Sequence, residues 1–139
     1  MIDFSEANFL VVGLARNCQA YLKNDVTKIN NAFSNSNSVQ WLIIESDSTD
    51  ETLKTLEKLK ENFNLDYLSL GKLESRYSSR TERIASCRNE YLRQIRCNPT
   101  YKKIDYVVVA DLDGANTNLK PHSVEQCWNL DEKWDACFA

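Results

Sequence analysis

The chain has 139 residues, a net charge of −3, 42% hydrophobic residues and 27% charged residues. This size and balance fit one globular domain and exclude a disordered chain. The acidic balance gives no reason to expect nucleic acid as a partner. No apolar run reaches the roughly 18 residues that a membrane span needs, and the short acidic N-terminus does not resemble a secretory signal. We therefore expect a cytoplasmic protein without a transmembrane segment, and leave a peripheral association with the membrane open.

Three short apolar runs predict the principal strands, at residues 9–14, 41–44 and 106–110. Apolar runs without alternation are typical of parallel strands that are covered on both faces. Weaker patterns predict two further strands, at residues 67–70 and near 134–136.

Apolar residues also recur at helical spacing, which predicts helices over residues 22–33, 53–63 and 81–96. Ser48 and Glu51 have capping-box spacing, which starts the second of these helices just past the preceding strand. The order strand, helix, strand, helix, strand predicts an α/β fold. We expect a Rossmann-like, doubly wound and mostly parallel sheet in three layers, α/β/α.

The cysteines and the single histidine carry no recognisable metal motif. The five cysteines are odd in number and include no Cys-x-x-Cys pair, which indicates free and mostly buried thiols rather than a zinc or redox site. His122 follows Pro121 at an expected helix start, so we expect a surface histidine, with a metal ligand as the alternative.

Carboxylates concentrate where the expected strands end, and in an open parallel sheet ligands bind beyond those ends. The first run ends in Ala15-Arg16-Asn17, the second in Glu45-Ser46-Asp47-Ser48-Thr49-Asp50 and the third in Asp111-Leu112-Asp113-Gly114. Asp111 and Asp113 are two positions apart, so on an extended strand both point to one face, roughly 7 Å apart. Their oxygens suit Mg²⁺ or Mn²⁺. The alternative is a polar turn that merely closes a strand.

The helix expected from Thr81 supplies a candidate anion-binding residue. Arg88 lies four residues after Ile84 and three before Tyr91, on or beside the inward-facing stripe. A guanidinium there needs an anion, either a structural carboxylate or a ligand phosphate. With the Asp pair this indicates a metal-bridged diphosphate site. The chain contains no Gly-x-Gly-x-x-Gly or P-loop sequence, so neither a dinucleotide site nor an NTPase is supported.

Three segments, in this order, resemble parts of the GT-A glycosyltransferases. Residues 41–52 are similar to the segment that usually reads Asp-Asp-Gly-Ser-Thr-Asp-Gly-Thr, although Glu45-Ser46-Asp47 departs from its paired aspartates and glycine. Residues 83–92 resemble the arginine-bearing helix of the family, and Asp111-Leu112-Asp113 is similar to its Asp-x-Asp metal motif. The form Arg-Ile-Ala-x-x-Arg-Asn and residues 134–137 also resemble the fungal capsule-type α-1,3-mannosyltransferases.

The resemblance implies a glycosyltransferase of the hexosyltransferase class, with a UDP- or GDP-linked nucleotide-diphosphate sugar as donor and Mn²⁺ or Mg²⁺ as cofactor. The glycan, lipid or protein acceptor stays unknown. The implied roles are metal binding by Asp113, contact with the metal or the sugar-ribose region by Asp111, a nucleoside pocket lined by Ala15, Arg16 and Asp47, and contact with the diphosphate or donor sugar by Arg83 and Arg88.

GT-A enzymes extend well past their metal motif, whereas this chain ends soon after Asp113. We therefore expect residues 1–139 to form a single nucleotide-sugar-binding domain that lacks the C-terminal acceptor-binding part, with any catalytic base outside the chain. One alternative is a non-catalytic nucleotide-sugar-binding module. A second is a haloacid-dehalogenase-like phosphatase with Asp111 as nucleophile and Asp113 as acid/base, although Ala115 replaces the threonine of that motif.

Overall fold

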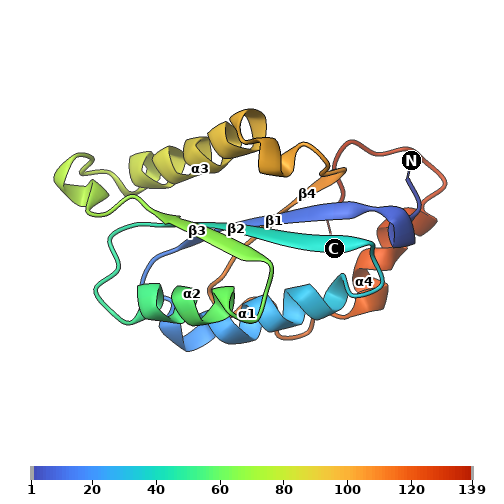
Figure 1. Cartoon of the computed structure of the whole chain (residues 1–139), viewed down its shortest axis with the longest axis horizontal. Coiled ribbons are helices and arrows are strands. Elements are labelled where there is room, and N and C mark those ends of the chain that lie inside the picture. The colour runs from blue at the N-terminus through green and yellow to red at the C-terminus, as the bar shows by residue number, and fades with distance from the viewer. Residues whose placement is uncertain (1, 139) are drawn as a thin grey trace.

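A computed structural model describes residues 2–138 (Figure 1). Its helices and strands are, in chain order, β1 (Asn8–Ala15), α1 (Gln19–Ala32), β2 (Ser38–Glu45), α2 (Thr52–Lys60), β3 (Leu65–Ser69), α3 (Arg80–Cys97), β4 (Tyr106–Ala110) and α4 (Pro121–Glu125). Short 3-10 helices lie at Phe4–Glu6, Leu73–Ser75, Pro99–Tyr101 and Gln126–Asn129.

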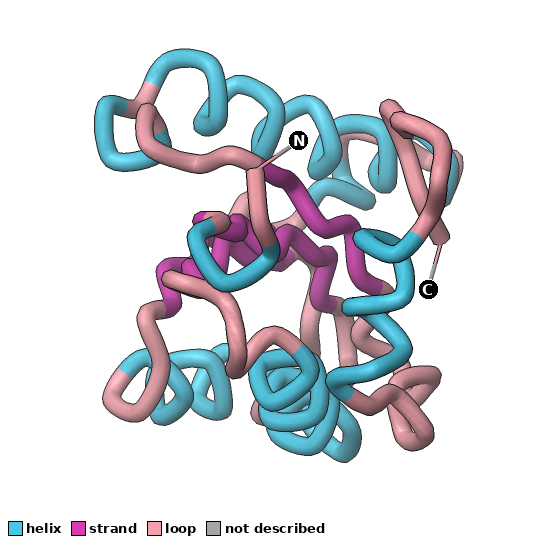
Figure 2. The backbone as a smooth tube through the Cα atoms, turned by 90° about the vertical axis from the view of Figure 1, so that its right-hand side faces the viewer, coloured by secondary structure: helices cyan, strands magenta, loops and turns pink. Residues whose placement is uncertain are grey.

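The strands form one parallel four-stranded sheet in the order β3-β2-β1-β4. Helices α1 and α2 cover one face of the sheet and α3 covers the other, as Figures 1 and 2 show from two directions. The chain therefore has the α/β, Rossmann-like, three-layer fold that the sequence predicts. The three principal strands and the three long helices lie where the apolar patterns place them, with ends that differ by a few residues.

The central strand β1 is buried on both of its faces, which explains its unbroken apolar sequence. Phe9 and Val11 belong to the core beneath α1 and α2, whereas Leu10 and Val12 belong to the core beneath α3. All four side chains are at most 1% exposed. Full burial of such a side chain contributes about 1.5–3 kcal/mol, so β1 holds the two helical layers on one sheet.

The prediction that all principal strands are covered on both faces is wrong for β4. This strand lies at the edge of the sheet, and Val107 and Val109 on its α3-facing side are 44% and 64% exposed. The strand predicted near residues 134–136 is also wrong, because this segment is not extended in a ladder. Trp134 packs instead against Trp128, with ring centroids 5.2 Å apart, and its indole donates a hydrogen bond to the carbonyl of Cys127 at 2.7 Å.

The predicted start of the second helix is wrong as well. Helix α2 begins at Thr52, because a turn follows β2 and its polar groups bind the loop between β1 and α1. The Ser48 hydroxyl accepts a hydrogen bond from the backbone N–H of Asn17 at 3.1 Å instead of capping the helix. Asp50 Oδ1 accepts the backbone N–H of Thr52 at 3.0 Å and satisfies one of the free donors at the helix start.

The remaining expectations concern the cysteines, the histidine and membrane-spanning helices. The five cysteines are free, and Cys18, Cys87 and Cys127 are buried, as predicted. His122 is exposed on α4, in agreement with a surface histidine. Among residues 2–138, no helix has both the length and the apolar composition needed to cross a bilayer.

Candidate functional site

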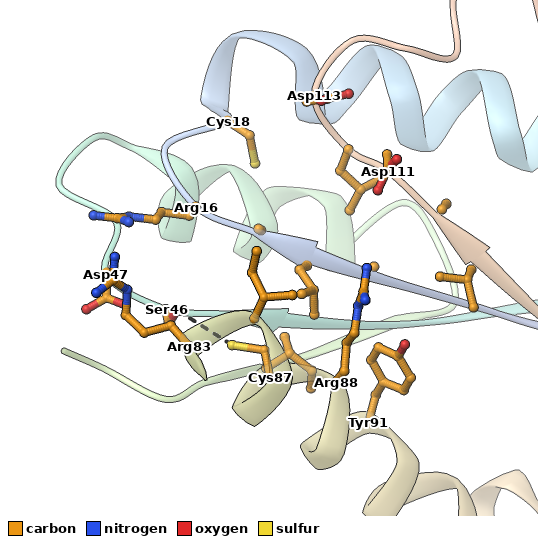
Figure 3. A pocket seen from close by; sticks show the side chains of 18 of the residues that line it. Arg16, Cys18, Ser46, Asp47, Arg83, Cys87, Arg88, Tyr91, Asp111 and Asp113 are labelled. Carbon is orange, nitrogen blue, oxygen red and sulfur yellow. Dashed lines mark hydrogen bonds between the residues drawn. The ribbon is translucent and has the colours of Figure 1, made fainter. Parts of the chain in front are cut away.

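A pocket of about 280 Å³ lies at the carboxyl ends of β1, β2 and β4, between the sheet and α3 (Figure 3). Every site residue predicted from the sequence lines it: Ala15, Arg16, Asp47, Arg83, Arg88, Asp111 and Asp113. These residues come from four segments that the parallel sheet brings together at one edge. Arg16, Asp47 and Arg83 group at one end of the pocket in Figure 3, and Asp111 and Arg88 lie nearer the other end.

The two acidic residues at the end of β2 have different surroundings. Glu45 is 1% exposed, and its oxygens accept hydrogen bonds from the backbone N–H of Ser48 and from the hydroxyl of Ser69. Glu45 therefore braces the turn after β2. Asp47 is 6% exposed, and only its Oδ1 accepts a hydrogen bond, from the backbone N–H of Glu74 at 2.9 Å. Its Oδ2 is buried with no hydrogen-bond partner among residues 2–138.

The Asp47 carboxylate is held in its charged form. Burial acts to raise the pKa of Asp47, but the hydrogen bond from the Glu74 backbone, the neighbouring Ser46 hydroxyl and the positive charges of Arg16 and Arg83 lower it below its ordinary value. The backbone of Asp47 also has a φ of 58°, a conformation that Asp adopts more readily than most residues. A strained, buried and charged acceptor facing a pocket is a candidate ligand contact.

The arginines of the pocket differ in how much of their binding capacity is already used. Arg16 forms an ion pair with Glu74 at 3.2 Å, and both side chains are about half-exposed. The Nη1 of Arg83 donates to the carbonyls of Tyr77 and Ser78, each at 2.8 Å, so part of Arg83 serves to hold the loop before α3.

The Arg88 guanidinium forms no hydrogen bond or ion pair with the residues that the structure describes, and it extends from α3 toward the sheet. The sequence predicts Arg88 on or beside the inward-facing stripe of α3. The buried residues of this helix are its neighbours Cys87 and Tyr91, while Arg88 itself is exposed at the pocket. Its solvation removes the need for a structural carboxylate and leaves the guanidinium free to bind a ligand anion.

Asp111 and Asp113 follow the last residue of β4 and are both exposed at the pocket. Neither carboxylate forms a hydrogen bond or ion pair within residues 2–138; Asp111 contributes only its backbone carbonyl, which accepts from the Asn116 amide at 2.7 Å. In that range no group of three or more His, Cys, Asp or Glu side chains is placed to hold a metal. Two free carboxylates still fit Mg²⁺ or Mn²⁺, because these ions often take one or two carboxylates together with phosphate oxygens and water.

Several pocket residues carry no sequence signal that assigns them a role. Ser46 and Cys87 line the pocket and lie 3.6 Å apart, and burial raises the pKa of the Cys87 thiol. Asn17 was recognisable only as a strand-end residue. Its φ of 49° suits asparagine, and its side-chain oxygen accepts the backbone N–H of Thr49 at 2.7 Å. The contact between Asn17 and Thr49 joins the segments after β1 and β2, next to the residues that line the pocket.

The fold and the pocket together define an open, parallel α/β domain of the Rossmann-like type with a polar site at the carboxyl ends of its strands. No protein-family model and no curated protein sequence matches the chain.

Among solved structures the chain is similar to TarS of S. aureus. The structure of TarS residues 1–349 aligns with a TM-score of 0.58 at 16% identity over 88% of this chain and 31% of TarS. The TarS complex with UDP aligns with a TM-score of 0.53 at 20% identity over 76% and 27%, and the complex with UDP-GlcNAc with 0.56 at 16% over 88% and 30%. The chain thus spans less than a third of these TarS structures. The likeness shows that the chain has the same parallel α/β fold as these TarS structures.

Proposed function

We propose that this chain is the donor-binding part of a glycosyltransferase that uses a nucleotide-diphosphate sugar and a divalent metal. The observation that carries the proposal is a single pocket that combines the free carboxylates of Asp111 and Asp113 with the unpaired guanidinium of Arg88. This combination matches the charge of a metal-bound diphosphate. The proposal is supported by the likeness to TarS, a glycosyltransferase, two of whose structures contain UDP and UDP-GlcNAc.

We assign the nucleoside to the end of the pocket that holds Ala15, Arg16 and Asp47. Asp47 lines this end of the pocket and its Oδ2 has no donor in the described chain, so a turn of the carboxylate toward the pocket would let it accept a ring N–H of the base. Uracil and guanine both offer such a donor, and therefore both UDP and GDP are candidates. The UDP complexes of TarS make UDP the first nucleotide to test.

We assign the diphosphate to the other end. Asp111 and Asp113 would hold Mn²⁺ or Mg²⁺, which when bound supplies Lewis-acid stabilisation of the departing nucleoside diphosphate. Arg88 would orient the phosphate oxygens and stabilise the negative charge that grows as the bond between the diphosphate and the anomeric carbon breaks. Arg83 lies at the nucleoside end of the pocket, so its remaining N–H groups would bind the diphosphate where it joins the nucleoside, or the donor sugar if the sugar folds back over it. The acceptor would bind outside this pocket, and any catalytic base would lie there too.

The first experiment is a thermal-shift panel of UDP, GDP and their sugars, each with and without Mn²⁺. A ligand at a hundredfold excess over its dissociation constant stabilises the folded chain by about 2.7 kcal/mol, which corresponds to roughly 8–12 °C for a domain of this size. We expect a shift that needs both one nucleotide and the metal, and that disappears in Asp113→Ala. The control Glu61→Ala removes an exposed carboxylate at the end of α2, outside the pocket, and should keep the shift.

The outcomes separate the proposal from its alternative. If no nucleotide shifts the melting temperature with or without metal, the donor site does not exist and the proposal is wrong. A non-catalytic module predicts the same shifts but no release of nucleoside diphosphate when the donor sugar, metal and a mixture of acceptors are supplied. Transfer in that assay identifies the enzyme.

A further inference from the structure

The segment after β4 alternates between two surroundings. Asp111 and Asp113 are exposed at the pocket, whereas Leu112 is 3% exposed and belongs to the core beneath α1. Gly114 is partly buried and also contacts α1. The two carboxylates can therefore hold a fixed position only if the inward-facing residues are held, and the contacts of Leu112 and Gly114 decide how rigid the pair is.

One inward contact is made by a carboxylate that the proposed reaction does not use. Asp25 lies on α1, is 0% exposed, and its Oδ2 accepts the backbone N–H of Gly114 at 2.8 Å. These residues are 89 positions apart in the chain. Its Oδ1 is buried with no hydrogen-bond partner among residues 2–138. Burying a carboxyl group with one unsatisfied oxygen destabilises the fold. An apolar side chain would therefore be more stable at this position, unless the hydrogen bond to Gly114 has a role.

A second contact restricts the same turn. Gly114 has a φ of 95°, and a side-chain carbon added there would lie 2.9 Å from the Tyr21 ring. Tyr21 and Asp25 are four residues apart and thus neighbours on one face of α1. This helix therefore presses against the Cα of Gly114 and binds its N–H at the same time. The backbone immediately after Asp113 is fixed in both position and orientation.

We propose that Asp25 is a positioning residue for the cation site: by binding the Gly114 N–H it holds the turn that presents Asp113, and with it Asp111, in ligating geometry before any metal arrives. The proposal rests on the proposed function only in taking these two aspartates as the metal-binding pair. Outer contacts that orient metal ligands typically change metal affinity by about 10–100-fold when they are removed. Asp25 would not touch the metal or the donor.

The test compares Asp25→Ala and Asp25→Asn with the unchanged 139-residue chain. Asparagine keeps an oxygen that accepts the Gly114 N–H, whereas alanine leaves none. Mn²⁺ affinity is measured by water proton relaxation, UDP affinity is measured at saturating Mn²⁺, and amide hydrogen exchange reports protection at Gly114. We expect Asp25→Ala to weaken Mn²⁺ binding about tenfold and to lose the Gly114 protection, while UDP binding at saturating Mn²⁺ stays the same. Asp25→Asn should retain most of both.

The possible results bear differently on the two proposals. Wild-type Mn²⁺ affinity and Gly114 protection in Asp25→Ala would overturn the positioning role, and so would equal losses in the alanine and asparagine variants, because the charge rather than the hydrogen bond would then matter. If Asp25→Ala does not fold, Asp25→Asn and Tyr21→Leu replace it in the test. Tenfold weaker Mn²⁺ binding in Asp25→Asn, together with wild-type Mn²⁺ affinity in Tyr21→Leu, contradicts the positioning role of the Asp25 hydrogen bond. If the wild-type chain binds Mn²⁺ but no nucleotide, the proposed function fails while the Asp25 comparison still stands. If it binds no Mn²⁺, both proposals fail.

Discussion

Gly13 on β1 allows Leu112 to lie between the two aspartates of the candidate metal pair. A methyl group added at Gly13 would stand 2.6 Å from Cδ1 and 3.0 Å from Cγ of Leu112, and 3.2 Å from the carbonyl oxygen of Ala110. Ordinary carbon contacts begin near 3.5 Å, so Leu112 or the backbone beneath it has to move. We expect Gly13→Ala to destabilise the fold by about 1–3 kcal/mol, the usual range for overpacking.

A double-mutant cycle tests the cause of this destabilisation. Leu112→Ala alone should lower the free energy of unfolding by about 2–5 kcal/mol through loss of a buried side chain. Gly13→Ala combined with Leu112→Ala should then lower it by at least about 1 kcal/mol less than the two single changes added together, because the clashing side chain is gone.

Thermal and urea unfolding measure these free energies. Gly13→Ala alone should lower the melting temperature by roughly 3–10 °C. The Mn²⁺ affinity of Gly13→Ala should fall with the stability, since displacement of Leu112 moves both neighbouring carboxylates. If the two changes are additive within about 0.5 kcal/mol, the contact between Gly13 and Leu112 does not control the turn and the reasoning is refuted.

Three further predictions concern Arg88 in the pocket, Glu45 at the end of β2 and Cys127 after α4. Arg88→Gln should weaken UDP binding about tenfold in calorimetry, whereas Arg93→Gln, which loses only an ion pair with Glu90 outside the pocket, should not; equal effects would contradict a specific anion contact. Glu45→Gln should lower the free energy of unfolding by about 1–3 kcal/mol, seen as a lower urea midpoint at unchanged m-value, because a neutral amide with one oxygen replaces a charged acceptor of two hydrogen bonds; wild-type stability would show that the brace is dispensable. Burial and contact with Cys137 raise the pKa of Cys127 from 9.0 to about 11. Between these pH values the thiol ionises only in the unfolded chain, so the free energy of unfolding falls as pH rises, by at most about 1.4 kcal/mol per pH unit. Cys127→Ser should flatten this slope, and an unchanged slope would refute the assignment.

Apolar patterning is enough to predict the layers of the fold and the segments that meet at the pocket. Unbroken apolar runs such as residues 9–14 and 106–110 identify parallel strands, and the polar residues that follow them must then meet at one edge of the sheet. Local chemistry thus sufficed to predict that Asp47, Asp111 and Asp113 line one pocket. Burial of β4 was predicted wrongly for a physical reason: an apolar run does not reveal which strand stands at the edge of the sheet.

The role of each polar side chain depends on contacts that form only in the folded chain. Glu45 and Asp47 are two residues apart and chemically alike, yet one is saturated by Ser48 and Ser69 while the other keeps a free buried oxygen. Helical spacing places Asp25 on the apolar stripe of α1, between Leu22 and Ile29, but only the fold brings the Gly114 N–H to it. A carboxylate's role depends on which donors reach it, and those donors come from segments far away in the chain, which no local pattern can specify.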